Sequence, residues 1–598
     1  MLRVNCHRIN DKGNIDSNGI TCSSRKGEAM KYNNFNASIY CPVWNLTSIT
    51  DFEEFDRKFQ LIQKNIKVGK VYLETYRGGQ MISFDQMSRV KEFFLNKGIE
   101  VAGGITTDGE YDAKEGGFSP QCYTSKVVEE RMKKVVTLTS ELFDEFILDD
   151  FYFTNCRCDD CITAKGEKSW SEFRISLMQD FSENVILKTA REMNPNVKVI
   201  IKFPNWYEHF QDAGYNLEEE PKIFDYIYTG TETRNPTYTQ QHLPKYLSYF
   251  IMRYFENVAP NRNLGGWFDP YECNYNLTSY IDQGYLTLFG KAKEAMLFSL
   301  GSLIDDKAFT TFPPVIGQAF TDVDNYLNNL GNPIGAATYI PYHSFGEDFL
   351  HNYVGMCGVP LEPYPEYPFE AKTIFLTESA AKDKELICKI KKSLSNGADV
   401  MVTSGLVSKL GEEFLELAHI SYSNKKVLAK NYMCSEDGGV TVGGNLEASK
   451  EIILTQPQFF TNDVWQIAGA YGEDNNTPVL MKTQYSKGRL FVLTIPDDQG
   501  NLYHYPGLIL NTIRGILSKD LPVVLEGDAK ITLFVYDNHT FILRSFLPYF
   551  SKASVIVKKE AAVLTDLENN RTLEGEAVEG GTKFTFNLSP GVNYVMKF

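Results

Sequence analysis

Short apolar runs alternate with amphipathic stretches along the first half of this chain, and this alternation limits the fold more than any other feature. From about Asn36 onward there are eight such units, and their apolar runs are 37–43, 70–76, 99–105, 146–153, 197–204, 226–230, 264–269 and 295–300. Between them, segments such as 127–143 and 171–193 carry apolar residues at helical spacing. Eight β/α repeats over roughly 300 residues predict a TIM (β/α)8 barrel. A doubly wound open sheet is the competing architecture.

The rest of the chain changes character, and its 598 residues exceed one hydrophobic core. We expect an N-terminal extension at 1–35, the barrel at 36–332, an α/β domain at 333–520 and a small C-terminal antiparallel β-sandwich at 521–598. The α/β domain is predicted from strand-like runs at 338–342, 372–377, 399–405 and 489–496 with helical patterns at 383–395 and 508–517. Cys388 falls within a helix and Cys357 in a Gly-rich loop, so we expect this domain to be non-catalytic.

Two adjacent carboxylates, Asp149 and Asp150, follow the fourth apolar run. In a β/α barrel the carboxyl end of a strand is the active-site face, so an acidic pair there indicates catalysis. Adjacent carboxylates do not both ionise easily, and we expect one to have a raised pKa. We assign Asp150 as the proton donor and Asp149 as its charged partner. An exposed Asp-Asp turn without chemistry is the alternative.

Other polar and aromatic residues follow the remaining predicted strands, and in a barrel all of them converge on one rim. They are Glu74 and Arg77 after strand two, Lys202 and Trp206 at strand five, Tyr228, Glu232 and Arg234 at strand six, and Trp267, Asp269, Tyr271 and Glu272 at strand seven. Carboxylates across an aromatic bowl suit glycosidic bond cleavage, which needs a proton donor and a group that stabilises or attacks the anomeric carbon. If a protein nucleophile operates, Glu232, Asp269 and Glu272 are the candidates, with Asp269 preferred. The aromatic residues are interpreted as sugar platforms; core packing is the alternative.

These strand ends resemble those of O-GlcNAcase-type β-N-acetylhexosaminidases. The matching stretches are Leu148-Asp149-Asp150, Pro204-Asn-Trp-Tyr207, Tyr228-Thr-Gly230 and Trp267-Phe-Asp269-Pro-Tyr271. The resemblance implies substrate-assisted catalysis, in which Asp149 orients a 2-acetamido group, Asp150 acts as general acid/base and Asp269 holds the sugar.

The order of domains resembles that of the three-domain β-galactosidases that trimerise through an amidotransferase-like middle domain. Those enzymes can carry zinc on a Cys-x-Cys-x-x-Cys motif plus a fourth Cys, and here Cys156, Cys158, Cys161 and Cys122 match. Four thiolates would form a structural zinc site; free or redox-active thiols are the alternatives. Asp149-Asp150 stand where that family has Asn-Glu. The resemblance implies a homo-oligomer built through the middle domain, and no cofactor for catalysis.

Composition excludes some partners. A net charge of -16 argues against nucleic acid and anionic membranes, and no run of eighteen apolar residues exists. The polar N-terminus lacks a signal-peptide pattern and the eleven cysteines are an odd number, so a cytoplasmic location is expected.

Together these features predict a glycoside hydrolase that removes terminal sugars from oligosaccharides or glycoconjugates by a retaining route. The first resemblance implies that an N-acetyl group of the substrate assists this route. The alternatives are double displacement of the β-galactosidase or α-glycosidase type with a carboxylate of strand six or seven, and a sugar-binding barrel without catalysis.

Overall fold

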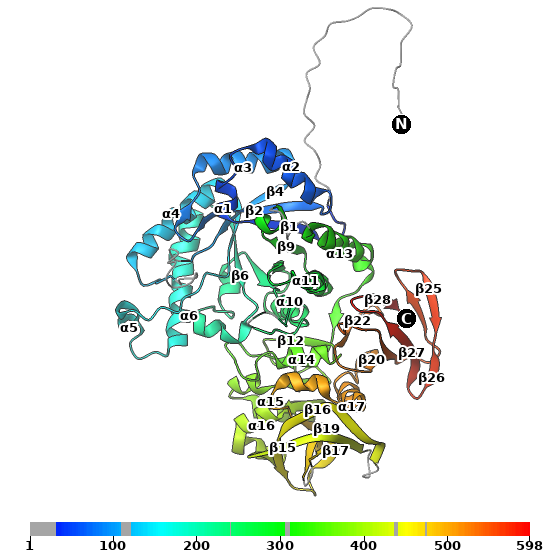
Figure 1. Cartoon of the computed structure of the whole chain (residues 1–598). Coiled ribbons are helices and arrows are strands. Elements are labelled where there is room, and N and C mark those ends of the chain that lie inside the picture. Colours follow the sequence, from blue (N-terminus) through cyan, green and yellow to red (C-terminus); the bar gives the residue numbers. More distant parts are fainter. Residues whose placement is uncertain are drawn as a thin grey trace, which may run out of the picture.

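The computed structural model describes residues 31–108, 121–237, 239, 241–304, 311–435, 441–472 and 475–598. Most of the predicted N-terminal extension, residues 1–30, lies outside the described residues. Three parts follow one another along the chain (Figure 1): a barrel, an α/β part beneath it in this view, and a β part beside both.

Eight parallel strands close into the barrel. They are β1 (Asn36–Cys41), β2 (Val68–Arg77), β4 (Glu100–Ile105), β5 (Glu145–Leu148), β6 (Lys198–Phe203), β7 (Tyr226–Gly230), β8 (Asn263–Phe268) and β9 (Glu294–Phe298). Strand β1 pairs with both β2 and β9, so the sheet has no open edge there. The surrounding helices include α2 (Phe52–Gln63), α3 (Phe84–Asn96), α4 (Lys126–Leu142), α6 (Trp170–Phe181), α10 (Leu247–Val258), α11 (Leu277–Phe289) and α13 (Phe312–Tyr326). The predicted TIM barrel is confirmed.

Side chains alternate between the barrel interior and the helices outside. The interior cluster contains Tyr40, Tyr72, Ala102, Ile147, Ile200, Tyr228, Trp267, Met296 and Phe298. Leu148 and Ile201 belong to the separate cluster that packs with the helices. Because strand side chains alternate with a period of two, a residue two positions after an interior one faces inward again. Asp149 is two positions after Ile147, and Lys202 is two positions after Ile200. By this rule both side chains point toward the barrel axis.

Strand β5 ends at Leu148, so the prediction of a strand reaching Phe153 was too long. The backbone N–H of Asp149 still donates to the carbonyl of Ile105 on β4, at 2.9 Å. The N–H of Tyr152 then donates back to the carbonyl of Asp149, at 3.0 Å, which closes a turn. The two aspartates therefore lie where the strand gives way to that turn.

The α/β part has a nine-stranded mixed sheet. Its parallel strands are β12 (Leu361–Tyr364), β11 (Ala336–Tyr339), β13 (Thr373–Leu376), β14 (Asp399–Thr403) and β19 (Gly488–Leu493), and its antiparallel strands are β18 (Asn476–Tyr485), β17 (Trp465–Tyr471), β15 (Ile420–Ser435) and β16 (Thr441–Phe459). Helices α14 (Leu350–Met356), α15 (Leu386–Ser395), α16 (Ser404–Leu410) and α17 (Gly507–Leu517) accompany it. The sequence predicted β11, β13, β14 and β19 and missed β12 and the long antiparallel strands.

The C-terminal part consists of two antiparallel sheets around one apolar core. One contains β21 (Ile531–Tyr536), β22 (Thr540–Ser545), β28 (Asn593–Lys597), β24 (Val563–Asp566) and β25 (Arg571–Glu574), and the other β20 (Val523–Glu526), β23 (Ser551–Val557), β27 (Gly581–Leu588) and β26 (Glu576–Val578). Strand β10 (Pro333–Ile334), which leaves the barrel, also pairs with β21.

Buried ion pairs join the parts to one another. Arg253 on α10 of the barrel contacts Glu362 on β12 of the α/β part, at 2.7 Å. Arg544 on β22 of the β part contacts Asp282 on α11 of the barrel, and both side chains are almost fully buried. Within the described residues, no helix combines the length and the apolar character that a membrane crossing requires.

Candidate active site

A cavity of about 260 Å³ opens at the carboxyl ends of the barrel strands. Its charged lining residues are Arg77, Asp149, Asp150, Lys202, Glu232, Arg234 and Asp269, and its aromatic ones are Trp44, Phe151, Trp267, Tyr271 and Phe298. This is the face on which TIM-barrel enzymes carry their active sites.

Lys202, at the end of β6, lies at the centre of the carboxylates. Its Nζ atom is 2.6 Å from Asp150 Oδ2, 3.0 Å from Glu232 Oε1 and 3.5 Å from Asp149 Oδ1. The ammonium group also lies 4.1 Å from the centre of the Trp267 ring. Only 2% of the Lys202 side chain is exposed, so these carboxylates replace water as its partners. The neighbouring charges hold the pKa of Lys202 above its ordinary value, and the lysine stays protonated.

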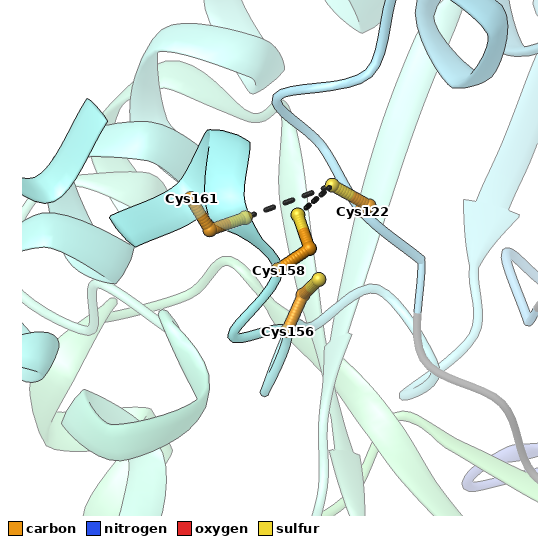
Figure 2. Close-up of side chains that lie close together, drawn as sticks. All are labelled: Cys122, Cys156, Cys158 and Cys161. Atoms are coloured by element: carbon orange, nitrogen blue, oxygen red, sulfur yellow. Dashed lines mark hydrogen bonds between the residues drawn. The ribbon is translucent and has the colours of Figure 1, made fainter. Parts of the chain in front are cut away.

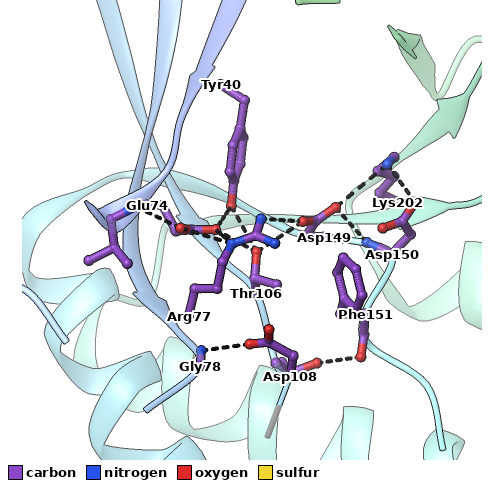
Figure 3. Close-up of polar contacts among 12 residues, drawn as sticks. Tyr40, Glu74, Arg77, Gly78, Thr106, Asp108, Asp149, Asp150, Phe151 and Lys202 are labelled. Carbon is purple, nitrogen blue, oxygen red and sulfur yellow. Dashed lines mark hydrogen bonds and ion pairs between the residues drawn. The ribbon is translucent and has the colours of Figure 1, made fainter. Parts of the chain in front are cut away.

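Asp149 is held from its other side by Arg77 and Thr106 (Figure 3). Arg77 Nη2 donates to Asp149 Oδ2 at 2.8 Å, and the Thr106 hydroxyl donates to the same oxygen at 3.0 Å. The backbone N–H of Asp150 donates to the other oxygen, Oδ1, at 2.8 Å. Both oxygens of Asp149 are therefore hydrogen-bonded, and the side chain is only 2% exposed.

Burial and charge separate the two aspartates. Burial raises the pKa of Asp150 to about 7, the negative charges of Asp149 and Glu232 add to this, and Lys202 opposes it. Burial acts in the same direction on Asp149, but Lys202, Arg77 and the hydrogen bonds from Asp150 outweigh it and lower the pKa. Near neutral pH the pair therefore consists of one anion, Asp149, and one group able to hold a proton, Asp150.

Glu232 and Asp269 follow β7 and β8, the next two strands after β6 around the barrel. Burial raises the pKa of Glu232, while the positive charge of Lys202 counteracts that effect. Asp269 forms a two-point ion pair with Arg234, at 2.8 and 3.0 Å, and also accepts from the backbone N–H of Tyr271 at 3.0 Å. Glu232 thus forms an ion pair with Lys202, whereas Asp269 forms an ion pair with Arg234.

An outer groove of about 400 Å³ continues from the cavity. It shares Asp150, Glu232 and Arg234 with the cavity and adds, among others, Asn205, Trp206 and Glu272. Asp150 consequently lies on the boundary between the two spaces. Its backbone carbonyl accepts a hydrogen bond from the Tyr215 hydroxyl, which fixes the residue there.

Two residues predicted to bind substrate line neither the cavity nor the groove. Glu74 is fully buried, pairs with Arg77 at 2.9 Å, and accepts from the Tyr40 hydroxyl at 2.8 Å and the Val43 N–H at 2.7 Å. Tyr228 is fully buried in the barrel interior and donates to Glu294 at 3.0 Å. Both side chains therefore lie in the barrel interior beneath the cavity, where they hydrogen-bond to neighbouring residues and do not face a ligand. The other predicted catalytic and substrate-binding residues line one space or both.

Sequence reasoning missed three aromatic residues of the cavity wall, Trp44, Phe151 and Phe298. The Arg77 guanidinium lies 5.1, 5.5 and 5.8 Å from their ring centres. Phe298 ends β9 and Trp44 follows β1 closely, so the rule that strand ends form the rim could have found both. Thr106, which follows β4 and orients Asp149, carried the same signal.

The four predicted zinc ligands come together (Figure 2). The Sγ atoms of Cys122, Cys156, Cys158 and Cys161 all lie within 4.8 Å of one another. Cys122 Sγ is 3.6 Å from both Cys158 Sγ and Cys161 Sγ. With zinc–sulfur bonds of about 2.3 Å, ideal tetrahedral sulfurs stand roughly 3.8 Å apart, so this donor set fits zinc.

A family model described as the catalytic domain of probable glycosyl hydrolases matches residues 24–324. The chain belongs to this family. Two further models match this glycosyl hydrolase: the second domain of the uncharacterized protein SSO3021 at 331–498, and a C-terminal domain of probable glycosyl hydrolases at 522–593. SSO3021 itself, from Saccharolobus solfataricus, is 25% identical to the hydrolase over 537 residues, which are 82% of this chain and 87% of the relative.

Solved structures share the fold of the hydrolase. The β-galactosidase from Bacillus circulans sp. alkalophilus is 11% identical with a TM-score of 0.62, covering 96% of this chain and 100% of the other. Alpha-L-fucosidase isoenzyme 2 from Paenibacillus thiaminolyticus is 11% identical with a TM-score of 0.62, covering 95% and 99%. The exo-beta-1,4-mannosidase Op5Man5 from Opitutaceae bacterium strain TAV5 is 11% identical with a TM-score of 0.52, covering 80% and 95%. The predicted glycoside hydrolase and the likeness to β-galactosidases are thereby confirmed.

Proposed function

We propose that this glycoside hydrolase removes single terminal sugars with retention of configuration, using Asp150 and Glu232 as its catalytic pair. The observation that carries this is the shared contact with Lys202. Since Asp150 Oδ2 is 2.6 Å and Glu232 Oε1 3.0 Å from one Nζ atom, the two oxygens are no farther apart than the sum of these distances. That limit is close to the separation of about 5–5.5 Å found in retaining enzymes, and below the roughly 6.5–9.5 Å of inverting ones.

In this mechanism Asp150 donates its proton to the departing glycosidic oxygen, because its raised pKa keeps it protonated near neutral pH. Glu232 attacks the anomeric carbon and forms a glycosyl-enzyme ester. Asp150, now ionised, takes a proton from water, and the resulting hydroxide equivalent releases the sugar and regenerates Glu232. Burial raises the pKa of Glu232, and Lys202 favours its anionic form against this effect, while the negative charge of Asp149 favours the charged form of Lys202.

The acetamide-assisted route is less well supported. It requires Asp149 to reach an N-acetyl group, but both Asp149 oxygens already accept hydrogen bonds and only 2% of the side chain is exposed. Asp150, whose side chain is 20% exposed, is the more accessible of the two. The α-glycosidase alternative uses Asp149 or Asp150 as the nucleophile and Glu232 as the acid, and only Asp150 of the two aspartates has an accessible side chain.

The size of the cavity supports exo action. At about 260 Å³ it is smaller than the roughly 300–1,000 Å³ that drug-sized ligands occupy, so one sugar ring suits it better than a length of polysaccharide. The related folds act on β-galactosides and α-L-fucosides according to their names, so aryl glycosides of these two sugars are the first to test.

The test is a panel of aryl β-galactosides, α-L-fucosides and N-acetyl-β-hexosaminides, followed by NMR of the first-formed anomer. We expect turnover of one class with retained configuration. Asp150→Asn should lose activity on poor leaving groups and regain it on activated ones when azide is added, because azide needs no general base. Inversion, or an Asp150→Asn variant equal to the wild type, would refute the proposal.

We also propose that the four cysteines hold a structural zinc ion. Thr154, between Asp150 and Cys156, donates to the carbonyl of Gln121, next to Cys122, at 2.9 Å. Thr107 donates to the carbonyl of Phe151 at 2.8 Å. A metal that binds both loops would therefore fix the turn that presents Asp150. Four thiolates leave no open coordination position, so the ion would have no part in the chemistry.

A further inference from the structure

We infer that the outer groove is a binding site for the leaving group, and that it selects a sugar that is not acidic. This rests on the proposed function, because it takes Asp150 as the proton donor. The donor must lie beside the oxygen that joins the two halves of the substrate. Asp150 lines both spaces, so a terminal sugar in the cavity directs the rest of the substrate into the groove.

One wall of the groove offers a rigid aromatic platform. The Trp206 ring packs edge-on against Phe153, Phe210 and Tyr215, with ring centres 5.8, 5.9 and 5.6 Å apart. Three such contacts fix the ring, and it remains partly exposed where it lines the groove. A fixed, flat apolar surface beside polar groups suits the face of a sugar ring.

The remaining lining is polar. Asn205 is anchored by a hydrogen bond from its amide to the carbonyl of Glu232, and Glu272, which follows β8, is exposed. An alkyl or lipid leaving group would cover these polar groups without offering hydrogen bonds, which is unfavourable for each group left unsatisfied. Sugar hydroxyls would supply the bonds.

Charge sets the second part of the selection. Glu232 pairs with Lys202 and Arg234 pairs with Asp269, so these charges are balanced within the site. Glu272 adds a further negative charge to the groove, on a chain whose net charge is already -16. A uronic acid or sulfated sugar would be repelled there, whereas a neutral or amino sugar would not.

The experiment compares three glycosides of the terminal sugar that the wild type cleaves, with 4-nitrophenol, glucose or glucuronic acid as the leaving group. We expect the wild type to prefer glucose over glucuronic acid by at least tenfold in kcat/KM. Glu272→Lys should shrink or invert this preference, and Trp206→Ala should reduce kcat/KM for the glucoside at least tenfold more than for the nitrophenyl glycoside. Glu141→Lys, the same substitution at an exposed site on α4, is the control and should leave all three ratios unchanged.

The inference would be overturned if Trp206→Ala lost the same factor in kcat/KM on the glucoside and on the nitrophenyl glycoside. It would also be overturned if Glu272→Lys left the preference for glucose over glucuronic acid unchanged. In either case, hydrolysis of the nitrophenyl glycoside would leave the proposed function standing. Turnover of none of the glycosides would overturn both.

Discussion

Lys202 Nζ lies 2.6 Å from Asp150 Oδ2, and this contact favours the ionised form of Asp150. The ammonium group lowers the pKa of Asp150 against the effect of burial. Without it, three carboxylates would face one another in a buried space. Lys202 therefore compensates the negative charge of the buried carboxylates and also lowers the pKa of Asp150.

Lys202→Met tests this contact. The pKa of Asp150 should rise further, so the pH at which activity falls on the alkaline side should move upward. The free energy of unfolding at pH 7 should drop by about 3–5 kcal/mol, because buried charges lose their partner. Both are measured by pH profiles and urea unfolding. Lys198→Met, on the same strand but more than half exposed, is the control and should cost no more than about 1 kcal/mol.

The raised pKa of Asp150 predicts the direction of the pH dependence. A carboxyl group with a pKa of about 7 is protonated below that pH and ionised above it. For substrates with poor leaving groups, kcat/KM should therefore fall about tenfold for each pH unit above roughly 7. The decline should be absent in Asp150→Asn measured with activated aryl glycosides and azide. An alkaline limb that persists in this variant would show that another group titrates.

Tyr228 should contribute to stability and not to sugar binding. Its hydroxyl donates to Glu294 in the barrel interior, so Tyr228→Phe should lower the free energy of unfolding by about 1–3 kcal/mol. Its kcat and KM should stay within twofold of the wild type. Tyr271→Phe and Tyr271→Ala offer the comparison, because Tyr271 lines the cavity and is 42% exposed; the alanine variant should raise KM. A larger rise in KM for Tyr228→Phe would contradict this assignment.

The cysteine cluster should contain one zinc ion per chain by elemental analysis. Cys158→Ser should lose most of the metal and lower the melting temperature, because the loops that carry Cys122 and Cys158 are no longer joined. Cys388→Ser, at an exposed thiol on α15, is the matched control and should keep both. A metal-free wild type with an unchanged melting temperature in Cys158→Ser would refute the proposed site.

The barrel and the acidic pair were predictable because both depend on local patterns. Eight apolar runs gave the eight strands, and Asp149 and Asp150 follow the fourth. The long hairpin of β15 and β16 was missed because its apolar runs are short and stand among many polar residues.

The depth at which strand-end side chains lie along the barrel axis was harder to predict. Glu74 and Tyr228 both face the barrel axis, as the cavity residues do, but they lie below the cavity floor. Depth along the axis depends on the stagger between neighbouring strands, which the sequence does not display. Likewise, the ion pair between Arg234 and Asp269 joins the ends of two different strands, so the sequence did not reveal it. The domain boundaries, cytoplasmic location and homo-oligomer stay predictions.

The catalytic pair is tested most directly by locating a trapped sugar. A 2-deoxy-2-fluoro glycoside of the preferred sugar with an activated leaving group should form a stable ester, and mass spectrometry of the digested protein identifies the residue that bears it. The mechanism predicts the label on Glu232, with Asp150→Asn still able to form it. A label on Asp269, Asp149 or Asp150 would contradict the roles assigned to the residues around Lys202.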